Sequence, residues 1–137
     1  MWIRCAFLLL LFSIFASAKN NPAVTITVRI EANQWNRTKL LEKLNKNSAK
    51  HGLIFSLAND GEQYDYRILF SMGKSPEAII INGTGGTTEY DTGFAAVFDS
   101  YDNELFRVKN EAWWNENTAT NGTAKKIIQR LIELRPK

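Results

Sequence analysis

Cysteine and histidine are almost absent from this chain of 137 residues, which has one of each, Cys5 and His51. Thiolate and imidazole groups are the ligands that zinc and related metals prefer, and they form many nucleophile–base pairs. We therefore predict no metal site, no cofactor and no catalytic residues. His51 precedes Gly52 at the expected end of a helix, where a partial positive charge suits the helix dipole, so we interpret it as a capping residue.

The chain also lacks a strong charge of either sign. It carries 17 basic and 14 acidic residues, which gives a formal net charge of +3. Nucleic-acid-binding proteins usually show clustered bases, so this balance argues against a nucleic-acid partner. Hydrophobic residues make up 45% of the sequence, which is typical of a globular domain with a real core. No linker divides the chain, so we expect a single domain.

Residues 1–18 have the three parts of a secretory signal peptide. Arg4 supplies the positive charge, an apolar run follows, and Ala16 and Ala18 place small residues where a signal peptidase requires them. The apolar run is shorter than the roughly 20 residues that a transmembrane helix needs. We predict cleavage after Ala18, which would remove the only cysteine. Residues 19–137 would then form a periplasmic or secreted domain without a stable membrane span.

Alternation of apolar and polar side chains predicts several strands. The signal is strongest over residues 24–31, where Val and Ile alternate with polar residues. Further strands are predicted around residues 53–57, 64–70, 78–81, 94–98 and 106–108. We interpret residues 73–76, which include Gly73 and Pro76, as a turn.

Helical spacing of apolar residues predicts two amphipathic helices. The first covers residues 39–50, with Asn36 as its N-cap and Gly52 as the left-handed residue past its end. The second begins near Thr118 or Thr123. Its apolar stripe consists of Ala124, Ile127, Ile128, Leu131 and Leu134.

The expected order of elements is therefore β-α-β-β-β-β-β-α, an α+β fold. Short connections between successive strands favour antiparallel pairing. We predict a single, mostly antiparallel sheet of five to six strands with both helices on one face. The opposite face would then meet water or a partner.

A segment rich in Gly and Thr, residues 82–88, is predicted to be a loop. Its backbone can adapt, and it offers hydroxyl and amide groups to a partner. Trp113 and Trp114 are adjacent, so in a strand they would face opposite sides and one would be exposed. An exposed indole supplies the apolar area of a binding hot spot. The candidate binding residues are Asn82, Thr84, Gly85, Gly86, Thr87, Trp113 and Trp114.

Two other functions stay open. Glu89 and Asp91 could share one strand face, as the paired carboxylates of a hydrolase do, although a solvated strand end explains them as well. Trp35, Trp113 and Trp114 could instead form the aromatic platform of a secreted carbohydrate-binding module.

Several short segments follow one another in an order that resembles small exported proteins of bacterial envelopes. These segments are Tyr64-Asp65-Tyr66, Ala96-Val97-Phe98-Asp99, Glu104-Leu105-Phe106-Arg107 and Ala124-Lys125-Lys126-Ile127-Ile128. The resemblance implies an accessory or assembly module and brings no catalytic residues with it. We therefore predict a non-catalytic periplasmic accessory domain that binds an envelope protein or glycan.

Overall fold

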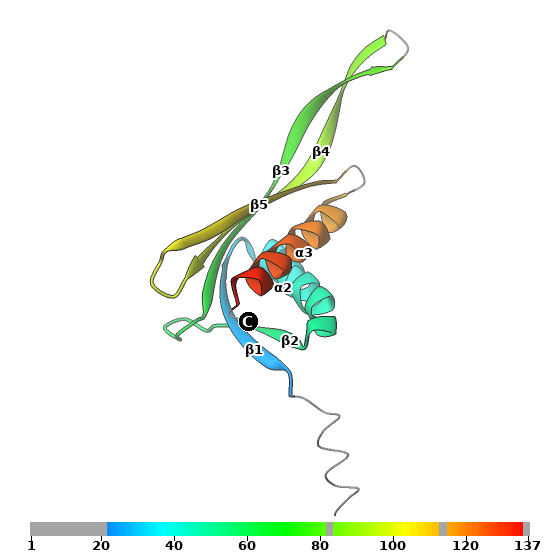
Figure 1. Cartoon of the computed structure of the whole chain (residues 1–137). Coiled ribbons are helices and arrows are strands. Elements are labelled where there is room, and N and C mark those ends of the chain that lie inside the picture. The colour runs from blue at the N-terminus through cyan, green and yellow to red at the C-terminus, as the bar shows by residue number, and fades with distance from the viewer. Residues whose placement is uncertain (1–21, 82–83, 113–114, 136–137) are drawn as a thin grey trace, which may run out of the picture.

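The computed structural model describes residues 22–81, 84–112 and 115–135, so the predicted signal peptide lies outside the described residues. Within them, five strands form one sheet beside two α-helices, which confirms the α+β class (Figure 1). The elements are β1 (Val24–Glu31), α2 (Gln34–Ser48), the short 3-10 helix η1 (Ala49–His51), β2 (Leu53–Leu57), β3 (Tyr66–Ile81), β4 (Thr84–Asp99), β5 (Glu104–Ala112) and α3 (Glu116–Leu134). In this part of the chain, neither helix combines the length and hydropathy that crossing a bilayer requires.

The sheet is mixed, with the strand order β2-β1-β3-β4-β5. β1 lies between β2 and β3 and runs parallel to both. β3, β4 and β5 pair antiparallel. The parallel pairing of β1 and β2 follows from α2, because a parallel neighbour needs a crossover connection that returns the chain to the same end of the sheet.

β3 and β4 are longer than the sequence predicts. The expected turn at residues 73–76 is wrong, because β3 runs through it and joins two of the six expected strands into one. The expected loop at residues 82–88 is also wrong for Thr84–Thr88, which belong to β4. Among the described residues, β3 pairs only with β4 beyond Leu69, so this part of β3 is an edge strand. An edge strand tolerates Pro76, because one side of it forms no ladder hydrogen bonds.

The far ends of β3 and β4 form a two-stranded arm that projects from the rest of the sheet (Figure 1). β1 stops pairing with β3 at Leu69, and β5 stops pairing with β4 at Asp91. The antiparallel ladder nevertheless continues to the pair Ile81 and Thr84. In the described chain, both outer edges of this arm are therefore left without a neighbouring strand.

α2 begins earlier than expected. Asn33, and not Asn36, is its N-cap: the Asn33 side chain accepts a hydrogen bond from the Asn36 N–H at 2.8 Å. After η1, Gly52 adopts the predicted left-handed conformation, with φ of 67°. A glycine suits this position because it has no β-carbon to clash in that conformation.

α3 also begins earlier than expected, at Glu116. The Asn115 side chain caps it by accepting a hydrogen bond from the Thr118 N–H at 2.8 Å. Four members of the predicted apolar stripe are buried, namely Ala124, Ile127, Ile128 and Leu131. Leu134, the last residue of the helix, is 50% exposed and does not belong to the core.

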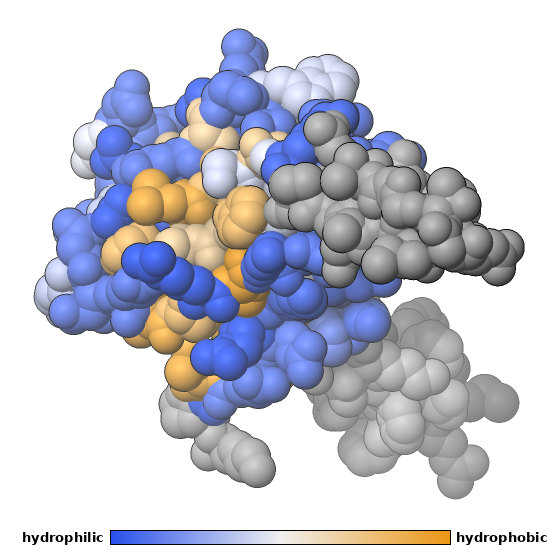
Figure 2. All heavy atoms as spheres, turned by 90° about the horizontal axis from the view of Figure 1, so that it is seen from above, coloured by the Kyte–Doolittle hydropathy of each residue, from blue (hydrophilic) through white to orange (hydrophobic). Residues whose placement is uncertain are grey.

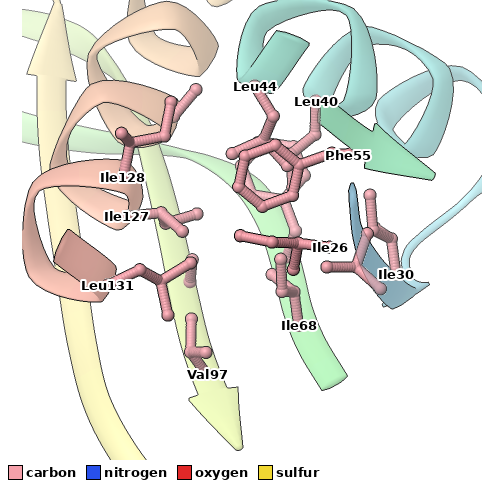
Figure 3. Close-up of a cluster of buried hydrophobic side chains, with 14 of the residues drawn as sticks. Ile26, Ile30, Leu40, Leu44, Phe55, Ile68, Val97, Ile127, Ile128 and Leu131 are labelled. Atoms are coloured by element: carbon pink, nitrogen blue, oxygen red, sulfur yellow. The ribbon is translucent and has the colours of Figure 1, made fainter. Parts of the chain in front are cut away.

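Both helices cover the same face of the sheet and enclose one core with it (Figure 3). α2 contributes Leu40 and Leu44, and α3 contributes its stripe. The sheet contributes Ile26, Val28, Ile30, Leu53, Phe55, Ile68, Phe70, Ala95, Val97 and Phe106. β1 and α3, which are far apart in the sequence, therefore meet in the same core.

Candidate functional site

The sequence-predicted binding residues lie partly outside the described residues and partly in β4. Asn82, Trp113 and Trp114 lie outside the described residues. Thr84, Gly85, Gly86 and Thr87 belong to the β4 half of the arm, opposite Ile81 to Ala78 of β3. Their role in binding stays a prediction, now placed on a strand instead of a loop.

The carboxylates considered for a hydrolase are at the base of the arm. Asp91 is half-buried and pairs across the ladder with Lys74, and the backbone of Glu89 pairs with that of Pro76. Positions 89 and 91 fall on the same face of β4, as the spacing of two requires. Among the described residues, no group of three His, Cys, Asp or Glu side chains is placed to hold a metal ion.

The pKa shifts in this structure have structural causes. The side chain and the backbone N–H of Asn59 lower the pKa of Glu62, and the Asn103 N–H is the main cause that lowers the pKa of Asp99. Arg107 lowers the pKa of Glu104 by hydrogen bonding. Each of these interactions favours the ionised carboxylate. A carboxyl group that acts as a general acid at neutral pH needs a raised pKa. The lowered pKa values of these three carboxylates instead reflect hydrogen bonds that hold the local structure.

The sheet face opposite the helices carries a continuous group of apolar side chains. Leu69 of β3 and Phe94 of β4 are 37% and 40% exposed, and Ala96 and Phe98 beside them are half-buried. The register brings them together, because Leu69 pairs with Ala96 and positions 94, 96 and 98 of β4 alternate onto the same face. We call these four residues the apolar strip.

Charged side chains border the apolar strip. Arg67 places its guanidinium 4.2 Å from the centre of the Phe98 ring and bonds two acids, Asp102 at 3.1 Å and Glu31 at 3.3 Å. The Lys109 ammonium lies 5.7 Å from the centre of the neighbouring Phe94 ring. Exposed ion pairs contribute at most about 1 kcal/mol each to stability, but they orient the cations over the aromatic rings.

The apolar strip is not flat. A shallow hollow of about 260 Å³ is lined by Leu69, Phe94, Ala96 and the side chain of Arg107, among others. In the view of Figure 2, apolar side chains gather in one area that hydrophilic side chains border. An apolar centre inside a charged rim is the usual composition of a protein-binding surface.

The sequence contains a signal for this strip. Residues 94–98 read Phe-Ala-Ala-Val-Phe, so both faces of this part of β4 are apolar. The expected alternation of Phe94, Ala96 and Phe98 is correct, but these residues lie on the uncovered face, while Ala95 and Val97 are buried under the helices. An apolar residue on both faces of a strand is the pattern that indicates a second contact surface.

Trp35, the third aromatic candidate, lies in the first turn of α2 and is 66% exposed. The Lys39 ammonium stands 5.1 Å from the centre of its indole ring. His51, the expected capping residue, is exposed at the end of η1.

No protein-family model matches this chain, and no curated protein matches it in sequence. Several solved structures resemble it in part. A minor lipoprotein from Acinetobacter baumannii aligns over 78% of this chain and 91% of its own length, with a TM-score of 0.49 and 11% identity. A PDZ domain protein from Parabacteroides distasonis aligns over 82% of this chain but 32% of its own length, with a TM-score of 0.48 and 9% identity. The PelC dodecamer from Paraburkholderia phytofirmans aligns over 82% and 92%, with a TM-score of 0.43 and 9% identity.

Proposed function

We propose that this chain is an exported, non-catalytic accessory domain that binds an envelope protein through the uncovered face of its sheet. The observation that carries the proposal is the apolar strip, in which Leu69 and Phe94 remain exposed beside charged side chains. Exposed apolar groups that form a continuous patch favour association, because covering them removes apolar area from water. The signal-like residues 1–18 support export of the domain.

The chemistry of the strip favours a protein over a small molecule. Its hollow of about 260 Å³ is smaller than the ligand pockets of about 300–1,000 Å³ that usually enclose small molecules. Aromatic rings and arginines are enriched in the centres of protein interfaces. Phe94, Phe98, Arg67 and Arg107 supply both residue types here.

The rim indicates what the partner presents. Arg67 and Lys109 are already paired with acids of this chain, at 3.1 Å to Asp102 and 2.8 Å to Glu111. The face is therefore close to neutral, and the partner should bring an apolar centre with charges of both signs around it. Such paired charges contribute more to the orientation of a complex than to its affinity.

Site-specific photo-cross-linking tests this proposal. Benzoyl-phenylalanine replaces Phe94 in the exported protein, expressed in the cells from which the chain comes. We expect one discrete cross-linked product with a second, different protein, which mass spectrometry then identifies. The matched control places the same group at Ser56, an exposed position on the same sheet face but on the outer strand β2, where no product should form.

A second pair of variants tests whether the product depends on the strip. With benzoyl-phenylalanine at position 94, Leu69→Lys should abolish the product, because it puts a charge in the apolar centre, and Thr25→Lys on the same face should not. Absence of any product at position 94 would contradict the proposal, as would equal products at positions 94 and 56. A product formed between two copies of this chain would assign the strip to self-association instead.

A further inference from the structure

A second hollow, of about 590 Å³, lies where α2 and α3 begin, at the base of the arm. Residues that line it include Trp35, Lys39 and Lys43 of α2, Asn117 of α3, and Lys74 and Asp91 of the arm. It is on the helix side of the sheet: Gly93 faces Thr123 of α3, and Asp91, two residues away in β4, shares that face. The apolar strip is on the opposite side, so the two surfaces are separate.

Trp35 is placed on the rim of this hollow by helical spacing. Residues 35, 39 and 43 are four apart and so lie on one side of α2. Trp35 takes no part in the core, and two thirds of its surface is open to solvent. Large indole rings are usually well buried, and an exposed one beside a hollow is a surface on which a flat apolar group can stack.

Lys43 supplies a polar group to the lining of the same hollow. Its side chain is only 9% exposed, and its ammonium is 3.8 Å from the carboxylate of Glu42. That distance is too long for a hydrogen bond, and an ammonium has three hydrogens to donate. Because this ammonium has three hydrogens and forms only an ion pair with the exposed Glu42, acceptor oxygens of a ligand in the hollow can also bond to it.

The overall charge of the lining is balanced. Three lysines and three acids contribute, together with amide side chains: Lys39, Lys43, Lys74, Glu42, Asp91, Glu116, Asn36, Asn115 and Asn117. The lining thus offers many donors and acceptors without a net charge. A ligand that fits this lining has several groups that both donate and accept hydrogen bonds, one apolar face and no charge.

We propose that this hollow binds a neutral saccharide, with one sugar ring stacked on Trp35. A sugar ring has a face of C–H groups that can lie on an indole, and its hydroxyls both donate and accept hydrogen bonds. Lys43 and Asn117 would donate to sugar oxygens, and Asp91 would accept from sugar hydroxyls. This site is independent of the proposed protein contact, because none of its lining residues belongs to the apolar strip.

The test screens the purified exported protein against an array of neutral and acidic oligosaccharides. Titration calorimetry then measures the dissociation constant for each oligosaccharide that the array retains. We expect at least one neutral oligosaccharide to bind, and Trp35→Ala to weaken it about tenfold or more, which corresponds to a lost contact of roughly 1.4 kcal/mol. Tyr101→Ala is the matched control, since Tyr101 is an 85% exposed aromatic residue in the β4–β5 turn, and it should bind as the wild type does.

A second substitution tests the polar part of the site. Lys43→Met keeps most of the buried aliphatic stem and removes the ammonium, so affinity for the neutral oligosaccharide should fall while the melting temperature is kept. The proposal is overturned if the array retains no neutral oligosaccharide, or if Trp35→Ala binds as tightly as the wild type. Retention of acidic oligosaccharides alone also overturns it. Phe94→Lys should leave saccharide binding unchanged, so this site and the protein-binding face can fail separately.

Discussion

α3 crosses β4 at Gly93 so closely that no side chain fits between them. A β-carbon at position 93 would lie 2.2 Å from Oγ1 of Thr123 and 3.3 Å from the carbonyl oxygen of Ala119. Thr123 is fully buried, and its hydroxyl donates to that same carbonyl at 2.8 Å. Gly93→Ala must therefore displace a buried, hydrogen-bonded side chain or the helix itself.

The cost of Gly93→Ala follows from these distances. An ordinary contact needs more than 3.4 Å, so the Thr123 hydroxyl would have to move by over about 1 Å, and overpacking of this kind costs about 1–3 kcal/mol. If the hydroxyl rotates away, it also loses its hydrogen bond in a buried site, which costs about 1–3 kcal/mol. We expect a loss of about 3 kcal/mol in the free energy of unfolding, or roughly 10 °C in melting temperature.

Urea denaturation followed by circular dichroism measures this loss. The double variant Gly93→Ala with Thr123→Ala should recover a large part of the lost free energy of unfolding, because it removes the Oγ1 atom that the new β-carbon would clash with. The coupling energy between the two substitutions should exceed about 1 kcal/mol. A second substitution for comparison is Gly122→Ala in α3. The added carbon would lie 2.1 Å from Nδ2 of Asn110, so the Asn110 side chain must shift, but alanine also gains about 1 kcal/mol of helix propensity. We therefore expect a smaller loss of stability than for Gly93→Ala. A Gly93→Ala variant as stable as the wild type, or a double variant without recovery, would refute the close approach of α3.

Three further predictions concern the core, a turn and the processing site. Ile128→Asp should lower the free energy of unfolding by more than about 3 kcal/mol, because Ile128 is 3% exposed in the core. The control Lys125→Asp changes an exposed residue and should alter that free energy by under about 0.5 kcal/mol. Similar melting temperatures for the two variants would contradict the placement of α3. The folded protein lowers the pKa of Asp99. The ionised Asp99 therefore stabilises the fold at pH values above about 4, the usual pKa in the unfolded chain. This stabilisation is lost as the pH falls through the lower pKa of the folded state. The difference in melting temperature between wild type and Asp99→Ala should therefore shrink below about pH 4, and a constant difference would count against this role. Intact-mass measurement should find that the exported protein starts at Lys19, and a product that retains Met1 would contradict cleavage after Ala18.

The sequence predicts the helices and the core of this protein well, and it fails where strand boundaries depend on long-range pairing. The alternation over residues 24–31 and the stripe around Ile127 and Ile128 reflect burial on one side, which is local in sequence. Gly73 and Pro76 usually mark a turn, but their effect depends on whether the strand has neighbours on both sides. The position of β1 between two parallel neighbours is likewise set by pairing that no short pattern contains.

The candidate surfaces were harder to predict than the fold. Phe94, Ala96 and Phe98 show the correct alternation, but alternation alone does not say which face the helices cover. The sequence indicates Trp35 as an aromatic candidate, but its position near Lys43, Asn117 and the arm depends on how α2 packs against α3. Both surfaces combine residues from distant segments, so sequence spacing cannot bring them together.

The meeting of β1 and α3 in one core also determines when the domain can fold. A chain made from its N-terminus produces β1 first, but β1 needs β2 and β3 as neighbours, and the core lacks Ile127, Ile128 and Leu131 until α3 is complete. Non-local contacts of this kind delay folding, because the chain must close long loops before they form. The domain should therefore remain without a stable core until α3 has been synthesised, and a chain truncated before Glu116 should stay unfolded instead of forming a smaller domain.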